Sequence, residues 1–121
     1  MASDQRLSIF QNADKDFALD CDNADGTPID LTGGRLTFTV RRQTGDAATS
    51  IVKDSDTPGE IDFNVDPTTG LATLRLNPAD TASLAIGKYR YDLWFVSAAG
   101  EQYPLIEDTL FSILKPITES P

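Results

Sequence analysis

The fourteen residues DTASLAIGKYRYDL, at positions 80–93, decide the fold of this chain. The pair Asn77-Pro78 before them supplies an N-cap residue and a proline at the first helical position, and Asp80 places a carboxylate near the first N–H groups of a short helical turn. Leu84 is expected to point from this turn into the core, and Gly87 to end it. After Gly87 polar and apolar residues alternate at period two, which predicts a strand with one buried face.

Three other segments, 35–41, 60–66 and 72–77, alternate in the same way, and the second is expected to direct Ile61, Phe63 and Val65 to the apolar side. Residues 66–70 and 98–101 are rich in turn formers and predict hairpins, the second of which links the Tyr89 strand to a strand at 102–106. The pattern predicts an all-β antiparallel sandwich or barrel with one short helical turn near residues 78–84. The expected core is Phe17, Leu36, Phe38, Val40, Ile61, Phe63, Leu74, Leu76, Tyr89, Tyr91, Leu93 and Phe111.

The 121 residues, 40% of them hydrophobic, are enough for one core, so we expect a single domain over 1–121, with its core at about 5–115 and an extended tail at 116–121. The longest apolar run has four residues, Leu93–Val96, far short of a membrane span. The first residues lack the basic and apolar regions of a secretory signal, so the product is expected to begin in a cytoplasm.

The formal charge is −9, from 19 acidic and 10 basic residues, and the longest basic run is the pair Arg41-Arg42. Such a surface repels phosphate backbones, so nucleic-acid binding is not expected. The acidity favours solubility or a basic partner surface, and composition does not choose between these two.

The residue types that most catalysis requires are scarce. The chain has no histidine, and its single cysteine, Cys21, is expected to be a buried small hydrophobe. Asp62, Asp66 and Asp92 fall on polar strand faces and are interpreted as solvated surface. We therefore predict no enzyme activity and no cofactor.

A calcium-binding loop is the one kind of metal site for which the sequence offers a candidate. Residues 20–26, DCDNADG, gather oxygen ligands in a loop. The spacing of an EF-hand fails, because Ala24 occupies the fifth position and Leu31 the twelfth, where a bidentate glutamate belongs. Aspartate, asparagine and glycine also satisfy turn geometry without an ion, so no metal is predicted.

The start of the Tyr89 strand resembles the tyrosine corner of immunoglobulin-like domains, in which a tyrosine hydroxyl bonds to the backbone a few residues upstream. By this resemblance Tyr89 is the corner residue, Asp80 belongs to the capped turn before it, and Tyr91 occupies the position where an antibody domain carries a cysteine. A bulky core residue at position 91 fits a chain without a disulfide.

The chain also resembles the immunoglobulin-like domain of phage baseplate upper proteins and small phage tail proteins. The resemblance lies in residues 10–17, in 26–41, and in 80–93 with the glycine hairpin and a closing strand at 107–114. It implies a non-catalytic structural protein of the virion, assembled in the host cytoplasm and placed in the tail, the baseplate or a fibre attachment. Larger members continue into a coiled coil or receptor-binding region, so the resemblance implies an anchoring or packing module here.

Two alternatives to a tail location remain open, a capsid decoration protein of the head and a host glycan-binding module. Copy number would separate head from tail. The glycan alternative needs several exposed rings, and Trp94 and Tyr103 are the candidates.

Trp94 is the strongest indication of a partner, because it falls on the side of its strand opposite Tyr89, Tyr91 and Leu93, with Val96 beside it. Aromatic anchors are enriched at protein interfaces, so Trp94, Val96 and Tyr103 are the predicted interface residues. A loop or the chain's own tail could cover Trp94 instead. The predicted partners are other virion proteins, with no membrane contact and with oligomers formed within the particle.

Overall fold

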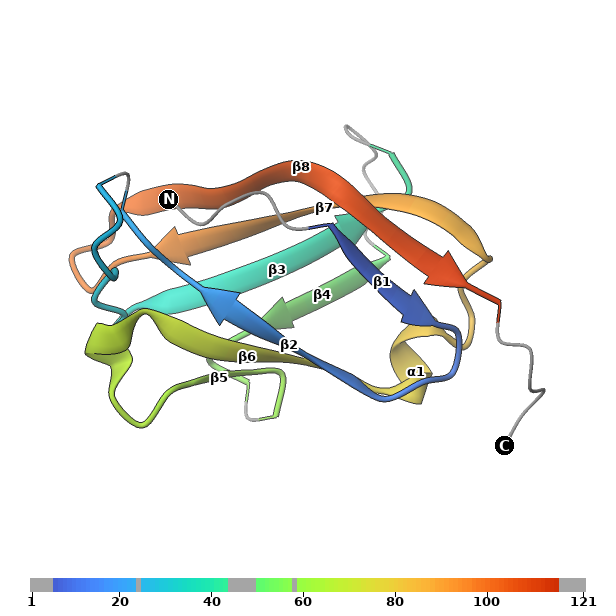
Figure 1. Cartoon of the computed structure of the whole chain (residues 1–121), viewed down its shortest axis with the longest axis horizontal. Helices are drawn as coiled ribbons and strands as arrows, with labels where there is room; N and C mark the ends of the chain where they lie inside the picture. The colour runs from blue at the N-terminus through green and yellow to red at the C-terminus, as the bar shows by residue number, and fades with distance from the viewer. Residues whose placement is uncertain (1–5, 24, 44–49, 58, 116–121) are drawn as a thin grey trace.

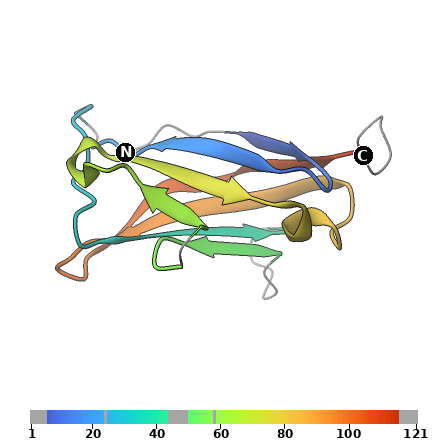
Figure 2. The ribbon, with the colours of Figure 1, turned by 90° about the horizontal axis from the view of Figure 1, so that it is seen from below.

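The computed structural model describes residues 6–23, 25–43, 50–57 and 59–115, and folds them into two β-sheets packed face to face (Figures 1 and 2). Strand formation follows the alternation of apolar and polar residues, since each strand buries one side. The elements are β1 (Leu7–Phe10), β2 (Lys15–Asp20), β3 (Arg35–Arg41), β4 (Ile51–Asp54), β5 (Ile61–Phe63), the 3₁₀ turn η1 (Pro67–Thr69), β6 (Leu71–Leu76), α1 (Pro78–Thr81), β7 (Gly87–Val96) and β8 (Gln102–Leu114).

The strand order identifies the fold. One sheet has the order β1-β8-β7-β3-β4 and the other the order β2-β6-β5. The chain crosses from one sheet to the other at β1–β2, β2–β3, β4–β5 and β6–β7, in the manner of an immunoglobulin-like sandwich, which confirms the predicted fold class. One detail differs from a purely antiparallel arrangement, because β1 pairs with β8 in parallel, Leu7 opposite Phe111.

The turn between β1 and β2 carries the chain from one sheet to the other and is fastened to the α1 region. The Gln11 side-chain amide donates a hydrogen bond to the Leu84 carbonyl at 2.8 Å, and the Asn12 backbone N–H donates to the Thr81 hydroxyl at 3.0 Å. Asn12 has φ 65°, a left-handed conformation that asparagine tolerates. These bonds hold the β1–β2 turn against the α1 region at one end of the sandwich.

The predicted core residues lie where expected, except that Phe63 is half-buried at the margin of the core. Phe38, Tyr91 and Phe111 form the centre, with ring centroids 5.2 to 6.4 Å apart. Tyr91 thus fills with a ring the place that the resemblance assigned to a cysteine. Cys21 is fully buried, as predicted.

Three local expectations are wrong. Val65 is fully exposed, because β5 ends at Phe63 and the chain then bends toward Asp66, whose side chain accepts the Thr68 N–H in the turn before β6. The helical turn ends at Thr81, and Gly87 instead begins β7, with φ 146°.

The third error concerns the closing strand. The segments 102–106 and 107–114 form a single strand, β8, in which Leu105 and Ile106 are both buried and Asp108 has φ 31°. This irregularity shifts the register against β7 by a bulge, so alternation breaks within one strand. The predicted tail, 116–121, lies outside the described residues.

Candidate interaction surface

Trp94 lies on the outer face of the five-stranded sheet. It belongs to β7, whose other face buries Tyr89, Tyr91, Leu93 and Phe95, and its side chain is 38% exposed. Cross-strand pairing sets its neighbours, with Thr37 of β3 on one side and Pro104 of β8 on the other. The described residues therefore leave the indole accessible to a partner.

Val96 shares this face, two residues further along β7, and is half-buried. Its register partners are Arg35 on β3 and Gln102 on β8. Trp94, Val96 and Pro104 together form an apolar area that we name the Trp94 patch. Its rings and branched side chain stand on hydrogen-bonded strands, so little side-chain freedom remains to be lost on docking.

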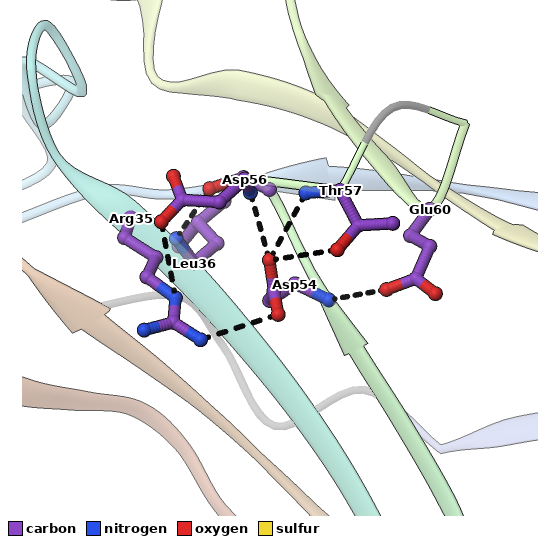
Figure 3. Close-up of polar contacts among 7 residues, drawn as sticks. Arg35, Leu36, Asp54, Asp56, Thr57 and Glu60 are labelled. Carbon is purple, nitrogen blue, oxygen red and sulfur yellow. Dashed lines mark hydrogen bonds and ion pairs between the residues drawn. The ribbon is translucent and has the colours of Figure 1, made fainter.

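Figure 3 shows the polar border of this patch, where β3 meets the turn after β4. The Arg35 guanidinium contacts the Asp54 carboxylate at 3.2 Å and the Asp56 carboxylate at 3.6 Å. Asp54 also accepts backbone N–H bonds from Asp56 at 2.8 Å and Thr57 at 3.1 Å. Because Asp54 pairs in register with Thr37, which itself pairs with Trp94, this cluster lies on the same sheet face as the indole.

The pKa of Asp54 reflects this setting. Partial burial acts to raise it, but the Asp56 N–H, the Arg35 guanidinium and the Thr57 N–H together outweigh that effect and hold the pKa below its usual value. Asp54 N–H in turn donates to the Glu60 carboxylate at 3.0 Å. The rim beside the patch is thus charged and ordered.

Tyr103 lies apart from the other two predicted interface residues. It is the register partner of buried Phe95, so it points to the opposite side of the sheet from Trp94. There it is 44% exposed and lines a hollow of about 310 Å³ with Ile29, Phe95, Leu105 and others. The structure therefore brings Trp94 and Val96 together and does not place Tyr103 with them.

The tyrosine corner is present. The Tyr89 hydroxyl donates to the Ala85 carbonyl at 2.7 Å, which ties the start of β7 to the turn after α1. The Arg42 guanidinium lies over the Tyr89 ring, 4.8 Å from its centroid. This contact joins the corner to the end of β3.

Comparisons with known proteins add little to this geometry. No protein-family model matches the sequence, and no curated protein matches it. A solved structure of murine CRIg is similar in shape, with a TM-score of 0.44 and 15% sequence identity over 96% of this chain and 95% of that one. The immunoglobulin-like fold stated above rests on the strand order and the corner.

Asp80 has a second role that the sequence did not reveal. Its carboxylate accepts the Asn77 N–H at 2.8 Å, as expected of a capping residue, and it also pairs with the Lys53 ammonium at 2.9 Å. The Lys53 side chain is only 6% exposed. A lysine on β4 carries no sequence signal for burial, because its partner lies 27 positions later and is brought near only by the fold.

Two of the three carboxylates considered for catalysis serve local structure. Asp62 pairs with Arg75 at 2.8 Å, and Asp66 caps η1. In the loop considered for calcium, Asp25 accepts the Thr27 N–H and hydroxyl at 3.0 and 2.6 Å. Within the described ranges no group of three His, Cys, Asp or Glu side chains could hold a metal ion, and no helix has the length and apolarity to span a membrane.

Proposed function

We propose that this chain is a non-catalytic structural protein of a phage particle that docks onto neighbouring virion proteins through the Trp94 patch. The observation that carries the proposal is the exposure of Trp94 from β7, an interior strand of the five-stranded sheet, next to Val96 and Pro104. An exposed tryptophan held on a rigid strand is a common anchor of protein interfaces.

The composition of this face supports a docking role. Tryptophan and arginine dominate the binding energy of protein interfaces, and such anchors lie inside a polar border that excludes water. Here Trp94 has Arg35 and Asp54 at its border. Because a stable interface buries roughly 800 Å² on each partner, the partner must also cover neighbouring parts of the sheet.

The assignment to a phage particle is supported by the resemblance of residues 10–17, 26–41 and 80–93 to the immunoglobulin-like domain of phage baseplate and tail proteins. The tail, baseplate or fibre attachment is the proposed location. The contacts would be made by the rigid sheet face, with no reaction and no cofactor.

Particle incorporation tests the proposal. Particles assembled with wild-type protein should retain it through density-gradient purification, and the Trp94→Ala protein should be lost although the isolated domain keeps its melting temperature. Val65→Ala is the matched control, because Val65 is fully exposed at a turn of the other sheet and should have no effect on incorporation.

Two results would contradict the proposal. Absence of the wild-type protein from purified particles would reject the virion assignment, and unfolding of the isolated domain by Trp94→Ala would show that the indole is needed for folding. Quantitative mass spectrometry of the same particles gives the location, since tail components are present in small numbers and head components in hundreds.

A further inference from the structure

A row of basic side chains crosses the outer face of the five-stranded sheet at some distance from the Trp94 patch. Arg41 of β3 lies directly opposite Arg90 of β7, and Arg90 lies opposite Leu110 of β8. The next strand continues the row with Arg6, because Leu7 pairs with Phe111 one position further on. Lys88, two residues before Arg90, shares the face. We name Arg6, Arg41, Lys88 and Arg90 the basic row.

Three of the four residues of the basic row line a hollow. Arg6, Lys88 and Arg90 surround a depression of about 540 Å³, with Asp108, Thr109 and Leu110 completing it. Three strand spacings separate β3 from β1, so the row is roughly 15 Å wide. A narrow protruding segment fits such a depression better than a flat surface does.

The charges of this row are mostly unbalanced within the described part of the chain. Asp108 pairs with Arg90 at 2.7 Å, whereas Arg6 and Lys88 have no ion-pair partner there. Among the residues that the structure describes, the buried Nε atom of Arg41 has no hydrogen-bond partner. Like charges directly opposite one another on adjacent strands are destabilising, so Arg41 beside Arg90 costs the isolated domain stability.

The same chain also carries an acidic surface that could complement the basic row in charge. Residues 16–34 contain five aspartates and no lysine or arginine. Four of them, Asp20, Asp22, Asp25 and Asp30, make no ion pair among the described residues, and Asp20, Asp25 and Asp30 are exposed. Asp20 ends β2, and the other three lie in the connection between β2 and β3, which projects from the end of the sandwich where β8 begins (Figure 1).

We propose that the basic row is the docking site for the acidic β2–β3 connection of a second copy of this chain. Arginine and carboxylate form paired, charge-assisted hydrogen bonds, which suit Arg6 facing an aspartate, and the Lys88 ammonium offers a second positive charge. The two surfaces differ, so the contact is heterologous, and a pair of copies keeps one free acidic end and one free basic row. Such contacts build a ring or a filament.

The net charge of −9 does not forbid this contact. Charges separated by more than the Debye length are screened, and that length is about 8 Å at physiological ionic strength and about 30 Å at 0.01 M salt. At very low salt the two acidic domains repel as whole molecules, and at high salt the local pairs weaken. Association should therefore be strongest at intermediate ionic strength.

A long polyanion suits the hollow less well than an acidic protein segment. Asp108 lies in the hollow and Leu110 lies between Arg90 and Arg6, so the row alternates charge with an apolar residue. In the acidic connection half-buried Ile29 lies between exposed Asp25 and Asp30, whereas Leu31 is buried in the core.

Analytical ultracentrifugation of the full chain up to millimolar concentration, at low, intermediate and high salt, tests the inference. Wild-type protein should associate most at intermediate salt. Arg6→Glu with Lys88→Glu should raise the dissociation constant about tenfold or more, and Asp20→Lys with Asp22→Lys should do the same. Mixing the two charge-reversed proteins should restore association, because each then offers the complement of the other. Lys15→Glu with Lys115→Glu changes the net charge equally outside the row and should leave a smaller effect.

A protein that stays monomeric at every salt concentration overturns the inference, as does a mixture that fails to associate or a control pair that weakens association as much as the row variants. A monomer whose basic row binds a short polyphosphate would reassign the row to phosphate. None of these outcomes bears on the Trp94 patch, whose test is incorporation into particles.

Discussion

The buried pair between Lys53 and Asp80 offers a quantitative test of how the sandwich is held together. Asp80→Asn keeps an oxygen that can accept the Asn77 N–H but removes the negative charge. The Lys53 ammonium, 2.9 Å away on a side chain that is 6% exposed, is then left without its counter-charge. Removing one partner of a buried ion pair costs about 3–5 kcal/mol, because the remaining charge stays desolvated.

That cost converts to a large thermal shift. For a domain of this size 1 kcal/mol corresponds to roughly 4 °C in Tm, so Asp80→Asn should lower Tm by about 12–20 °C. Lys53→Met should cost less, since the Asp80 side chain is 16% exposed and keeps its capping bond. Asp62→Asn, which removes the exposed partner of Arg75, is the matched control and should melt close to wild type.

Differential scanning calorimetry of the two single variants and the double variant completes the cycle. Lys53→Met should recover part of the stability lost in Asp80→Asn, because the double variant leaves no buried charge unpaired. The coupling free energy between the two substitutions should reach about 1–3 kcal/mol. Additive effects of the two substitutions, or an Asp80→Asn protein that melts within about 4 °C of wild type, would refute the interpretation of the pair as buried and coupled.

Three further predictions concern single groups. Tyr89→Phe deletes the hydroxyl that donates to Ala85 and should cost about 1 kcal/mol by urea unfolding, whereas Tyr103→Phe, at an exposed ring, should not change the unfolding midpoint. Burial and the neighbouring Asp20 and Asp22 raise the pKa of Cys21 to about 12. At pH 8 native protein should therefore resist a thiol reagent that modifies the urea-unfolded chain at once. Rapid labelling of native protein would contradict the assignment of Cys21 to the core. The pKa of Asp54 is lowered in the folded state, so its contribution to stability is present above the unfolded pKa of about 3.9 and is lost as pH falls through the folded value. Asp54→Asn should therefore reduce Tm at pH 7 and have a shrinking effect below about pH 4, and an equal reduction at pH 7 and pH 2 would show that its charge is not responsible.

The parts of the structure that follow from short-range pattern were predictable. The alternation after Gly87 placed Tyr89, Tyr91 and Leu93 in the core. The resemblance to a tyrosine corner predicted a bond from the Tyr89 hydroxyl to upstream backbone, and the structure shows the acceptor to be the Ala85 carbonyl. The outward position of Trp94 also follows from period two alone.

The remaining features depend on which strands become neighbours in the sheets. Local sequence patterns do not predict this pairing or its register. Lys53 appears as an ordinary polar residue until β4 is placed near the α1 turn that holds Asp80. Arg6, Arg41 and Arg90 are far apart in the chain and form a row only through the pairing of β1, β8, β7 and β3. The bulge in β8 shifted one half of that strand, which is why its two halves were predicted as separate strands.

Incorporation of Trp94→Ala protein into purified particles is the most direct measurement of the central claim, that this domain works by docking the outer face of its five-stranded sheet. The expected result is a folded variant with unchanged Tm that is missing from particles, beside a Val65→Ala control present at wild-type copy number. A folded Trp94→Ala protein incorporated as fully as wild type would contradict the claim.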